Sequence, residues 1–113
     1  MLTIYHNPRC SKSREGLTFL EEKGVDYKII KYLDEPLTKE ELTSLLQKLN
    51  YKPIELVRTK ETIWKETFAD KELSDDAIIE AMVTYPKLIE RPIIINGDRA
   101  VVARPTEKIE DIL

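Results

Sequence analysis

Cys10 is the residue best suited to carry out chemistry in this chain of 113 residues. It is the only cysteine, and it stands between Leu2–His6, whose alternation predicts a strand, and a helical pattern that follows. The N–H groups and the dipole at the start of a helix stabilise a thiolate, and the cations Arg9, Lys12 and Arg14 act in the same direction. We therefore expect a reactive thiol rather than a small buried apolar side chain.

The start of the same helix would bind an anion directly beside the sulfur. A tetrahedral oxyanion needs further positive charge and forked donors, which arginine supplies. Arg58 follows the short apolar patch Ile54–Val57, Arg91 precedes a β-branched run, and Arg104 follows another strand-like segment. If these strands are neighbours in one sheet, their ends could bring Arg91 and Arg104 near Cys10. The alternative is that these arginines lie on the surface and take no part in a site.

The residues around Cys10 weigh against other thiol chemistries. A phosphatase loop would need an arginine six positions after the cysteine, where this chain has Gly16. A monothiol glutaredoxin with an iron–sulfur cluster would have Gly-Phe before Ser13, where this chain has Ser11-Lys12. One cysteine and one histidine cannot form an intrachain disulfide or a structural zinc site of four such ligands. We expect no metal, and an external thiol as the partner of Cys10.

Hydrophobic periodicity predicts an α/β fold with the order β-α-β, a helical stretch, a β-hairpin and a final helix. Gly24 fits the C-terminal cap of the first helix, and Asn96-Gly97 predicts the hairpin turn. The expected strands are Leu2–His6, Tyr27–Tyr32, Ile93–Ile95 and Ala100–Ala103, and the expected flanking helices are Ser11–Lys23 and Pro105–Leu113.

The stretch at about 36–89 is expected to be a helical insertion in a single domain, 1–113. Thr38 and Glu41 form a capping-box pattern, and leucines follow at helical spacing. Short helical segments are expected at Pro53–Arg58 and Thr59–Thr67, and Ser74 fits the start of a further helix. The predicted buried positions are Leu42, Leu45, Leu46 and Leu49 in the first of these helices and Ile78, Ile79, Met82 and Val83 in the last.

Composition favours a soluble globular protein, with 42% apolar and 35% charged residues. Because 18 basic residues stand against 21 acidic ones, the net charge of −3 argues against a general nucleic-acid partner. No apolar run approaches the roughly 18 residues of a membrane span, and the N-terminus has no secretory pattern. We expect a cytoplasmic protein without a membrane partner.

Four motifs together resemble the glutaredoxin-coupled arsenate reductase family, or ArsC family, over essentially the whole chain. They are His6–Arg14 (HNPRCSKSR), Leu56–Arg58, Glu90–Ile94 and Ala103–Pro105, and the first is similar to the YfgD-like branch. The resemblance implies a thioredoxin-like fold with a mixed four-stranded sheet, and a cis-proline, Pro92, that faces the active-site loop.

The resemblance also implies a role for each matching residue. Arsenate would be the substrate, glutathione and glutaredoxin the reducing partners, and no cofactor would be bound. The chain departs from the well-studied arsenate reductases at Ser11-Lys12, where they have Gly-Thr. By position, Cys10 is the nucleophile, His6, Ser13 and Arg14 stabilise the thiolate, and Arg58, Arg91 and Arg104 bind the oxyanion.

The role of His6 and the substrate each leave alternatives. His6 could be a structural imidazole, a base or a cation that lowers the thiol pKa, and we favour the pKa-tuning role. The leading interpretation is a glutathione/glutaredoxin-dependent arsenate reductase. A glutathione-dependent thiol reductase acting on another substrate would need Cys10 but not all three arginines. An Spx-like regulator that binds RNA polymerase would share the fold, but such proteins typically carry a second cysteine where this chain has Ser13.

Overall fold

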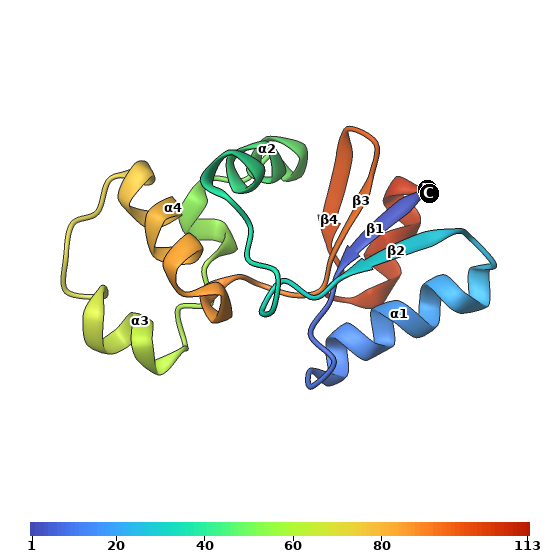
Figure 1. The fold of residues 1–113 in the computed structure, drawn as a ribbon, viewed down its shortest axis with the longest axis horizontal. Coiled ribbons are helices and arrows are strands. Elements are labelled where there is room, and N and C mark those ends of the chain that lie inside the picture. Colours follow the sequence, from blue (N-terminus) through green and yellow to red (C-terminus); the bar gives the residue numbers. More distant parts are fainter. The chain divides into compact units, whose positions relative to one another are not determined.

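The computed structural model describes residues 1–113 and is drawn as a ribbon in Figure 1. The chain forms two compact units: one combines Met1–Glu35 with Arg91–Leu113, and the other is Pro36–Glu90. The first unit contains the sheet, and the second contains only helices. The interpretation of the whole chain as one domain stays a prediction.

The first unit is built on a mixed four-stranded sheet, as predicted, and the strand order in the sheet is β2-β1-β3-β4. β1 is parallel to β2 and antiparallel to β3, which is antiparallel to β4. The parallel pair needs a crossover connection, and the helix α1 supplies it. The elements are β1 (Leu2–Tyr5), α1 (Ser11–Lys23), β2 (Tyr27–Ile30), β3 (Ile93–Asn96), β4 (Arg99–Val102) and the 3₁₀ helix η3 (Thr106–Ile112).

The core of this unit lies between the sheet and the helices α1 and η3, which cover the same face (Figure 1). Ile4 of β1 and Ile94 of β3 are paired across the sheet, and both are fully buried. Leu20 of α1 and Ile109 of η3 belong to the same cluster. The carboxyl end of β1 and the start of α1 are thereby fixed on one packed scaffold.

Turn residues close the elements of the first unit as their types predict. Gly24 ends α1 in the left-handed conformation with φ 69°, and Gly97 has φ 65° in the turn between β3 and β4.

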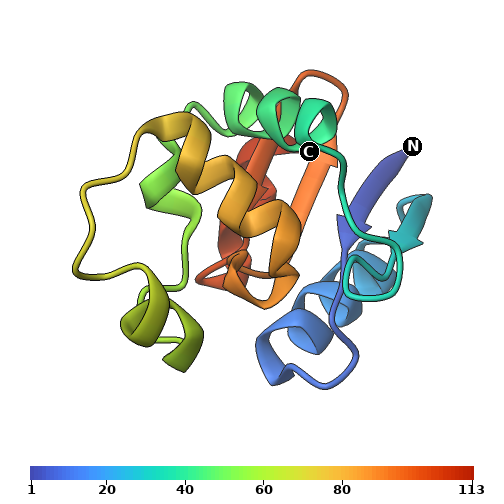
Figure 2. The same cartoon turned by 60° about the vertical axis from the view of Figure 1, so that its left-hand side comes forward.

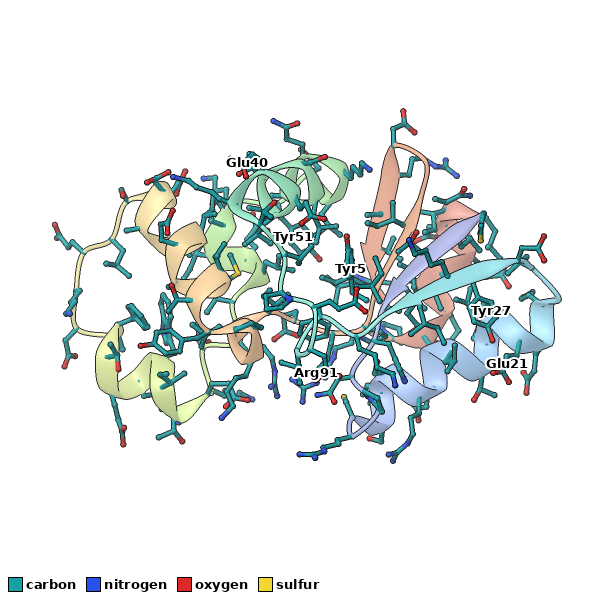
Figure 3. All side chains as sticks on the ribbon, in the orientation of Figure 1. Tyr5, Glu21, Tyr27, Glu40, Tyr51 and Arg91 are labelled. Atoms are coloured by element: carbon teal, nitrogen blue, oxygen red, sulfur yellow. The ribbon has the colours of Figure 1, made fainter.

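The hydroxyl of Tyr27 on β2 donates to Glu21 Oε1 of α1 at 3.2 Å, and both side chains are labelled in Figure 3.

The second unit consists of α2 (Lys39–Leu49), η1 (Pro53–Leu56), α3 (Thr62–Thr67), α4 (Asp75–Thr84) and η2 (Pro86–Leu88). The predicted capping box is present: Thr38 Oγ1 accepts from the Glu41 N–H, and Glu41 Oε1 accepts from the Thr38 N–H. All four predicted leucines of α2 are buried. α2 and α4 lie side by side (Figure 2). No helix of the chain is both long and apolar enough to cross a membrane.

Several predicted boundaries were wrong by a few residues. The first strand ends at Tyr5 rather than His6, because the next position of the antiparallel partner is Pro92, which has no N–H for the ladder. The second strand ends at Ile30 because the Lys31 carbonyl accepts the N–H groups of a turn. The last helix is a 3₁₀ helix, and α3 begins at Thr62 rather than Thr59.

The predicted apolar face of α4 also differs in one position. Ile78, Ile79 and Met82 are buried as expected, but Ala81 is buried in addition and Val83 is only half-buried. Helical spacing therefore located the face but not its edge.

Candidate active site

Cys10 is the N-cap residue of α1 and is largely buried, with 8% of its surface exposed. The loop that leads to it is tightly folded. The Cys10 N–H donates to the Asn7 carbonyl at 3.0 Å, and the Arg9 N–H donates to Asn7 Oδ1 at 3.0 Å. The Cys10 carbonyl accepts from the Arg14 N–H at 3.0 Å, which starts the helix. The sulfur is thus fixed at the helix N-terminus.

Ser13 connects the first turn of α1 to the end of β1. Its side chain is fully buried, and its Oγ lies 2.7 Å from Nδ1 of His6, with which it forms a hydrogen bond. The same hydroxyl accepts from the Asn7 N–H at 3.0 Å. Buried polar groups that are paired in this way stabilise one arrangement of the loop.

The side chains of Arg14 and Lys12 make contacts with partners other than the sulfur. Arg14 Nη1 donates to the Pro8 carbonyl at 3.1 Å and so supports the backbone of the loop. Lys12 Nζ lies 3.4 Å from a carboxylate oxygen of Glu15 in an exposed ion pair. The expected effect of these neighbouring cations on the thiol stays a prediction, and a further arginine acts on the sulfur through its charge.

Arg91 is that arginine. Burial raises the pKa of the Cys10 thiol, but the Ser13 N–H, the hydrogen bond and charge of Arg91, and the Lys12 N–H together outweigh it, so the pKa is lowered. The sulfur makes no regular capping hydrogen bond, and the two N–H groups act on it as dipoles at the helix start. Cys10 is therefore predisposed to ionise more readily than an ordinary thiol.

The packing of Pro92 explains how Arg91 reaches Cys10. A Cβ atom at Gly16 would lie 3.0 Å from Cγ of Pro92, so glycine lets α1 and the segment before β3 approach this closely without displacement of the proline ring. The Arg91–Pro92 peptide bond is cis. Arg91, labelled in Figure 3, comes from the segment just before β3. A contact between distant parts of the sequence thus completes the surroundings of the sulfur.

Arg104 is attached to the same segment. Its Nε donates to the Arg91 carbonyl at 2.8 Å, and the Ala103 N–H donates to the Pro92 carbonyl at 2.9 Å. The Arg104–Pro105 bond is a second cis bond, which the sequence analysis did not predict. Nε of Arg91 is buried and has no hydrogen-bond partner. The first unit therefore brings two of the three predicted arginines together, and one buried donor of Arg91 has no partner in the structure.

Arg58 belongs to the second unit, where two carboxylates surround it. Its Nη1 forms an ion pair with Glu61, and its Nε lies 4.0 Å from an oxygen of Glu90. Its backbone N–H donates to the Leu88 carbonyl at 2.7 Å. The participation of Arg58 in one site with Cys10 stays a prediction. Sequence reasoning missed both acidic partners, although Glu61, at i+3, is a common ion-pair spacing.

His6 is 5% exposed, and its pKa is lowered from the usual value. Burial is the main cause, the charge of Lys31 adds to it, the contact with Ser13 opposes it, and Arg14 lowers the pKa further. The imidazole is therefore mainly neutral at pH 7. The expected effect of His6 on the thiolate stays a prediction, and Ser13 offers an indirect route for it.

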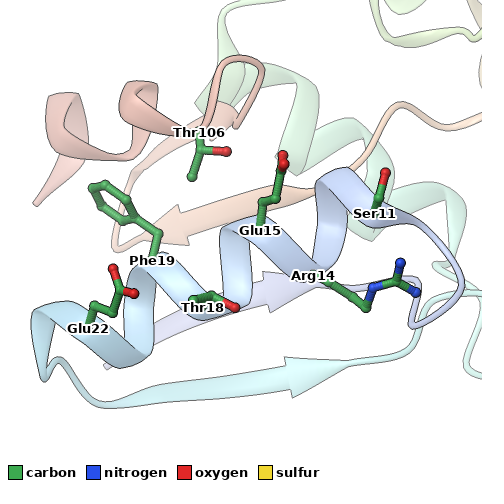
Figure 4. Close-up of a pocket in the computed structure, with 7 residues that line it drawn as sticks. All are labelled: Ser11, Arg14, Glu15, Thr18, Phe19, Glu22 and Thr106. Carbon is green, nitrogen blue, oxygen red and sulfur yellow. The ribbon is translucent and has the colours of Figure 1, made fainter.

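A groove begins beside the site and runs along α1 (Figure 4). Its walls carry charges of both signs, and no group of three or more His, Cys, Asp or Glu side chains is arranged to hold a metal ion. The residues that line it are Ser11, Arg14, Glu15, Thr18, Phe19, Glu22 and Thr106.

Comparisons with known proteins identify the family of the chain. The family model described as the ArsC family matches residues 5–112. The uncharacterized protein YfgD of Escherichia coli K12 is 46% identical over 112 residues, which cover 97% of this chain and 94% of that protein. An arsenate reductase of Neisseria meningitidis serogroup A is 41% identical, covering 99% and 97%. The solved structure of an arsenate reductase from Vibrio cholerae superimposes with a TM-score of 0.94 at 46% identity, covering 99% and 97%. With the thioredoxin-like sheet and the cysteine loop in place, the chain belongs to the ArsC family.

Proposed function

We propose that this protein is a glutathione/glutaredoxin-dependent arsenate reductase with Cys10 as its nucleophile. One observation carries the proposal: the thiol with a lowered pKa lies at a helix N-terminus and in contact with Arg91, whose buried Nε has no partner. A nucleophile and donors for an oxyanion therefore occupy the same place. Arsenate reductases among the relatives support arsenate as that oxyanion.

In the first step, the Cys10 thiolate attacks arsenic. A sulfur–arsenic bond forms, an arsenic–oxygen bond breaks, and the oxygen leaves as water after it takes up protons. Arg91 and Arg104 stabilise the charge on the remaining oxygens, together with N–H groups at the start of α1. Arg58 is proposed as the third cation, and it would have to exchange its carboxylate partner Glu61 for the anion.

In the second step, glutathione is the second thiol: its sulfur and that of Cys10 together supply the two electrons that reduce arsenic. Its thiolate attacks the sulfur of Cys10, a disulfide forms, and the electron pair of the broken sulfur–arsenic bond stays on arsenic. Arsenate is thereby reduced to arsenite. A glutaredoxin thiolate then attacks the glutathione sulfur of the mixed disulfide and releases the Cys10 thiolate. The reaction needs an external thiol and no bound cofactor, and we expect it in a reducing, cytoplasmic compartment.

His6, Ser13 and Arg14 are proposed to support the thiolate rather than to react. Ser13 presents its N–H to the sulfur and its hydroxyl to His6, and Arg14 holds the Pro8 carbonyl. Each of the three acts on the shape of the loop, so their replacement should change the reactivity of Cys10 before it changes anion binding.

The test is an NADPH-coupled assay with glutathione, glutathione reductase and glutaredoxin, with Cys10→Ser as the matched control. Arsenate-dependent oxidation of NADPH that disappears in the variant is the expected result. No turnover by a protein whose Cys10 still alkylates rapidly at pH 7 would refute arsenate as the substrate.

A glutathione-dependent thiol reductase acting on another oxidised substrate is the second candidate. The ion pairs of Arg58 with Glu61 and Glu90 favour it, because a reductase of that kind does not need this arginine for an anion. Titration with arsenate separates the two functions: saturable protection of Cys10 against alkylation is expected only of the arsenate reductase.

A further inference from the structure

A cavity of about 380 Å³ lies against the loop that leads to Cys10. It forms because β1 and β2 are parallel, so that the segments after both strands emerge at the same edge of the sheet. The His6 N–H donates to the Ile30 carbonyl at 2.9 Å and holds the two segments together. The lining residues, all in the first unit, are His6, Asn7, Pro8, Arg9, Lys31, Leu33 and Asp34.

The cavity has two unpaired cations. Neither Arg9 nor Lys31 forms an ion pair, whereas Lys12 and Lys23 in the same unit are each paired with a glutamate. Asp34 is the single acidic residue of the lining. Leu33, which is 41% exposed, adds an apolar wall. A small ligand with carboxylates and some apolar surface fits this combination.

The distance along the chain connects the cavity to the nucleophile. Pro8 and Arg9 directly precede Cys10, so their Cα atoms lie within about 8 Å of its Cα, at 3.8 Å per residue. An extended tripeptide spans about 10 Å. A thiol of tripeptide size could therefore leave its carboxylates in the cavity while its sulfur reaches the sulfur of Cys10.

We propose that Arg9 and Lys31 bind the carboxylates of the reducing thiol, and that the cavity is the glutathione subsite. This inference rests on the proposed function, which requires such a thiol as the second substrate. A cavity of this volume is within the range of roughly 300–1,000 Å³ that small ligands occupy.

The other hollow beside the catalytic loop fits an anionic thiol less well. The groove of Figure 4 carries two glutamates, Glu15 and Glu22, against the single cation Arg14. Carboxylates in the ligand would be repelled there. The cavity at Lys31 has the opposite balance of charge, which is why it is assigned to the reductant.

The test is thiol–disulfide exchange without arsenate. The Cys10 thiolate attacks glutathione disulfide, the bond between the two glutathione sulfurs breaks, a mixed disulfide forms and one glutathione thiolate leaves. The rate is compared with that of hydroxyethyl disulfide, which is neutral. The ratio of the two rates cancels changes in the reactivity of the thiol itself and reports recognition of the charged glutathione.

Arg9→Gln and Lys31→Gln should each lower this ratio about fivefold, the size expected of an exposed ion pair. Lys31→Arg keeps the charge and should retain the ratio. Lys28→Gln is the matched control, because Lys28 is exposed on β2, three residues before Lys31, and does not line the cavity. It removes the same charge from the same part of the chain and should leave the ratio unchanged.

Two results would overturn the subsite: equal ratios in the wild type and both glutamine variants, or an equal fall in the Lys28→Gln control. The second result would mean that overall charge, and not the cavity, selects the disulfide. Because no arsenate is present, failure of the proposed function gives a different pattern. In that case arsenate turnover is absent, while the ratio still falls in the cavity variants only.

Discussion

Replacement of Arg91 by glutamine should slow the alkylation of Cys10 by iodoacetamide at pH 7 by about threefold. The fraction of thiolate falls about tenfold, but the remaining thiolate is about threefold more nucleophilic because its pKa is higher. The stabilisation of the thiolate that is lost is about 1.4 kcal/mol. The value is at the low end of the range for hydrogen bonds to a charged group, because the Arg91 side chain is only half-buried. Arg91 acts on the thiolate through a hydrogen bond and through its charge, and glutamine removes the charge. Iodoacetamide is neutral, so steering of the reagent does not contribute.

The dependence of the alkylation rate on pH shows the direction of the pKa shift. A thiol whose pKa lies below the ordinary value is more ionised than a free cysteine in the interval between the two values. Without Arg91 the pKa rises, so the variant should react more slowly than the wild type at pH values well below its own pKa. At high pH, where both thiols are fully ionised, the variant should react about threefold faster than the wild type, because its thiolate is less stabilised.

Two further variants make the result specific. Arg99 is an exposed arginine beside the turn between β3 and β4, at the other end of this strand pair from Arg91. Arg99→Gln should therefore leave the pH profile of alkylation unchanged. Arg91→Lys keeps the charge and should retain more of the reactivity, but lysine has no planar fork for an oxyanion. The variant should therefore lose about 3 kcal/mol of transition-state stabilisation, and its arsenate turnover should fall more than a hundredfold. A wild-type profile in Arg91→Gln would refute the assignment of Arg91 as the group that lowers the thiol pKa.

Three other changes test the surroundings of the site. Gly16→Ala should gain about 1 kcal/mol of helix propensity in α1 but lose about 1–3 kcal/mol to the tight contact of its Cβ with Pro92, so that urea unfolding should show no net stabilisation. A stabilisation by the full ~1 kcal/mol of helix propensity would contradict the close approach. Ser13→Ala should cost about 1–3 kcal/mol in the same measurement, because it leaves a buried imidazole nitrogen and a backbone N–H without their partner. Glu61→Gln should lower the KM for arsenate about threefold, by releasing Arg58 from its ion pair. A KM that does not change in Glu61→Gln would remove Arg58 from the proposed oxyanion site.

Sequence patterns predicted the elements best where the signal is local. The capping box of Thr38 and Glu41 predicted the start of α2. The change from a strand pattern to a helical pattern at Cys10 predicted that this residue lies at the start of α1. Both signals depend on neighbours within one helical turn. Strand ends were less predictable. β1 ends at Tyr5 because a proline directly precedes β3, the partner strand, and no local pattern around Tyr5 indicates that proline.

The chemistry of the site was predicted by residue type but not by contact. Arg91 was a candidate from its place before a buried strand, yet its position beside the thiol depends on the packing of Pro92 against Gly16. Arg14, four residues after Cys10, donates to the carbonyl of Pro8, and its expected effect on the thiolate stays a prediction. Neighbours in the sequence set the shape of the loop, and residues brought in by the fold set its charge.

Arg91 can serve two anions at once, and that is the physical basis of the proposed reaction. A guanidinium has five N–H donors in a rigid plane, so the donors that face the Cys10 thiolate leave others for an oxyanion. As an anion binds, its charge competes with the thiolate for the same guanidinium. The thiolate is then less stabilised at the moment when the electrophile lies beside it, and a less stabilised thiolate is the stronger nucleophile. A lysine at the same position would have three donors on a single nitrogen and no planar fork to hold the oxyanion by two parallel hydrogen bonds.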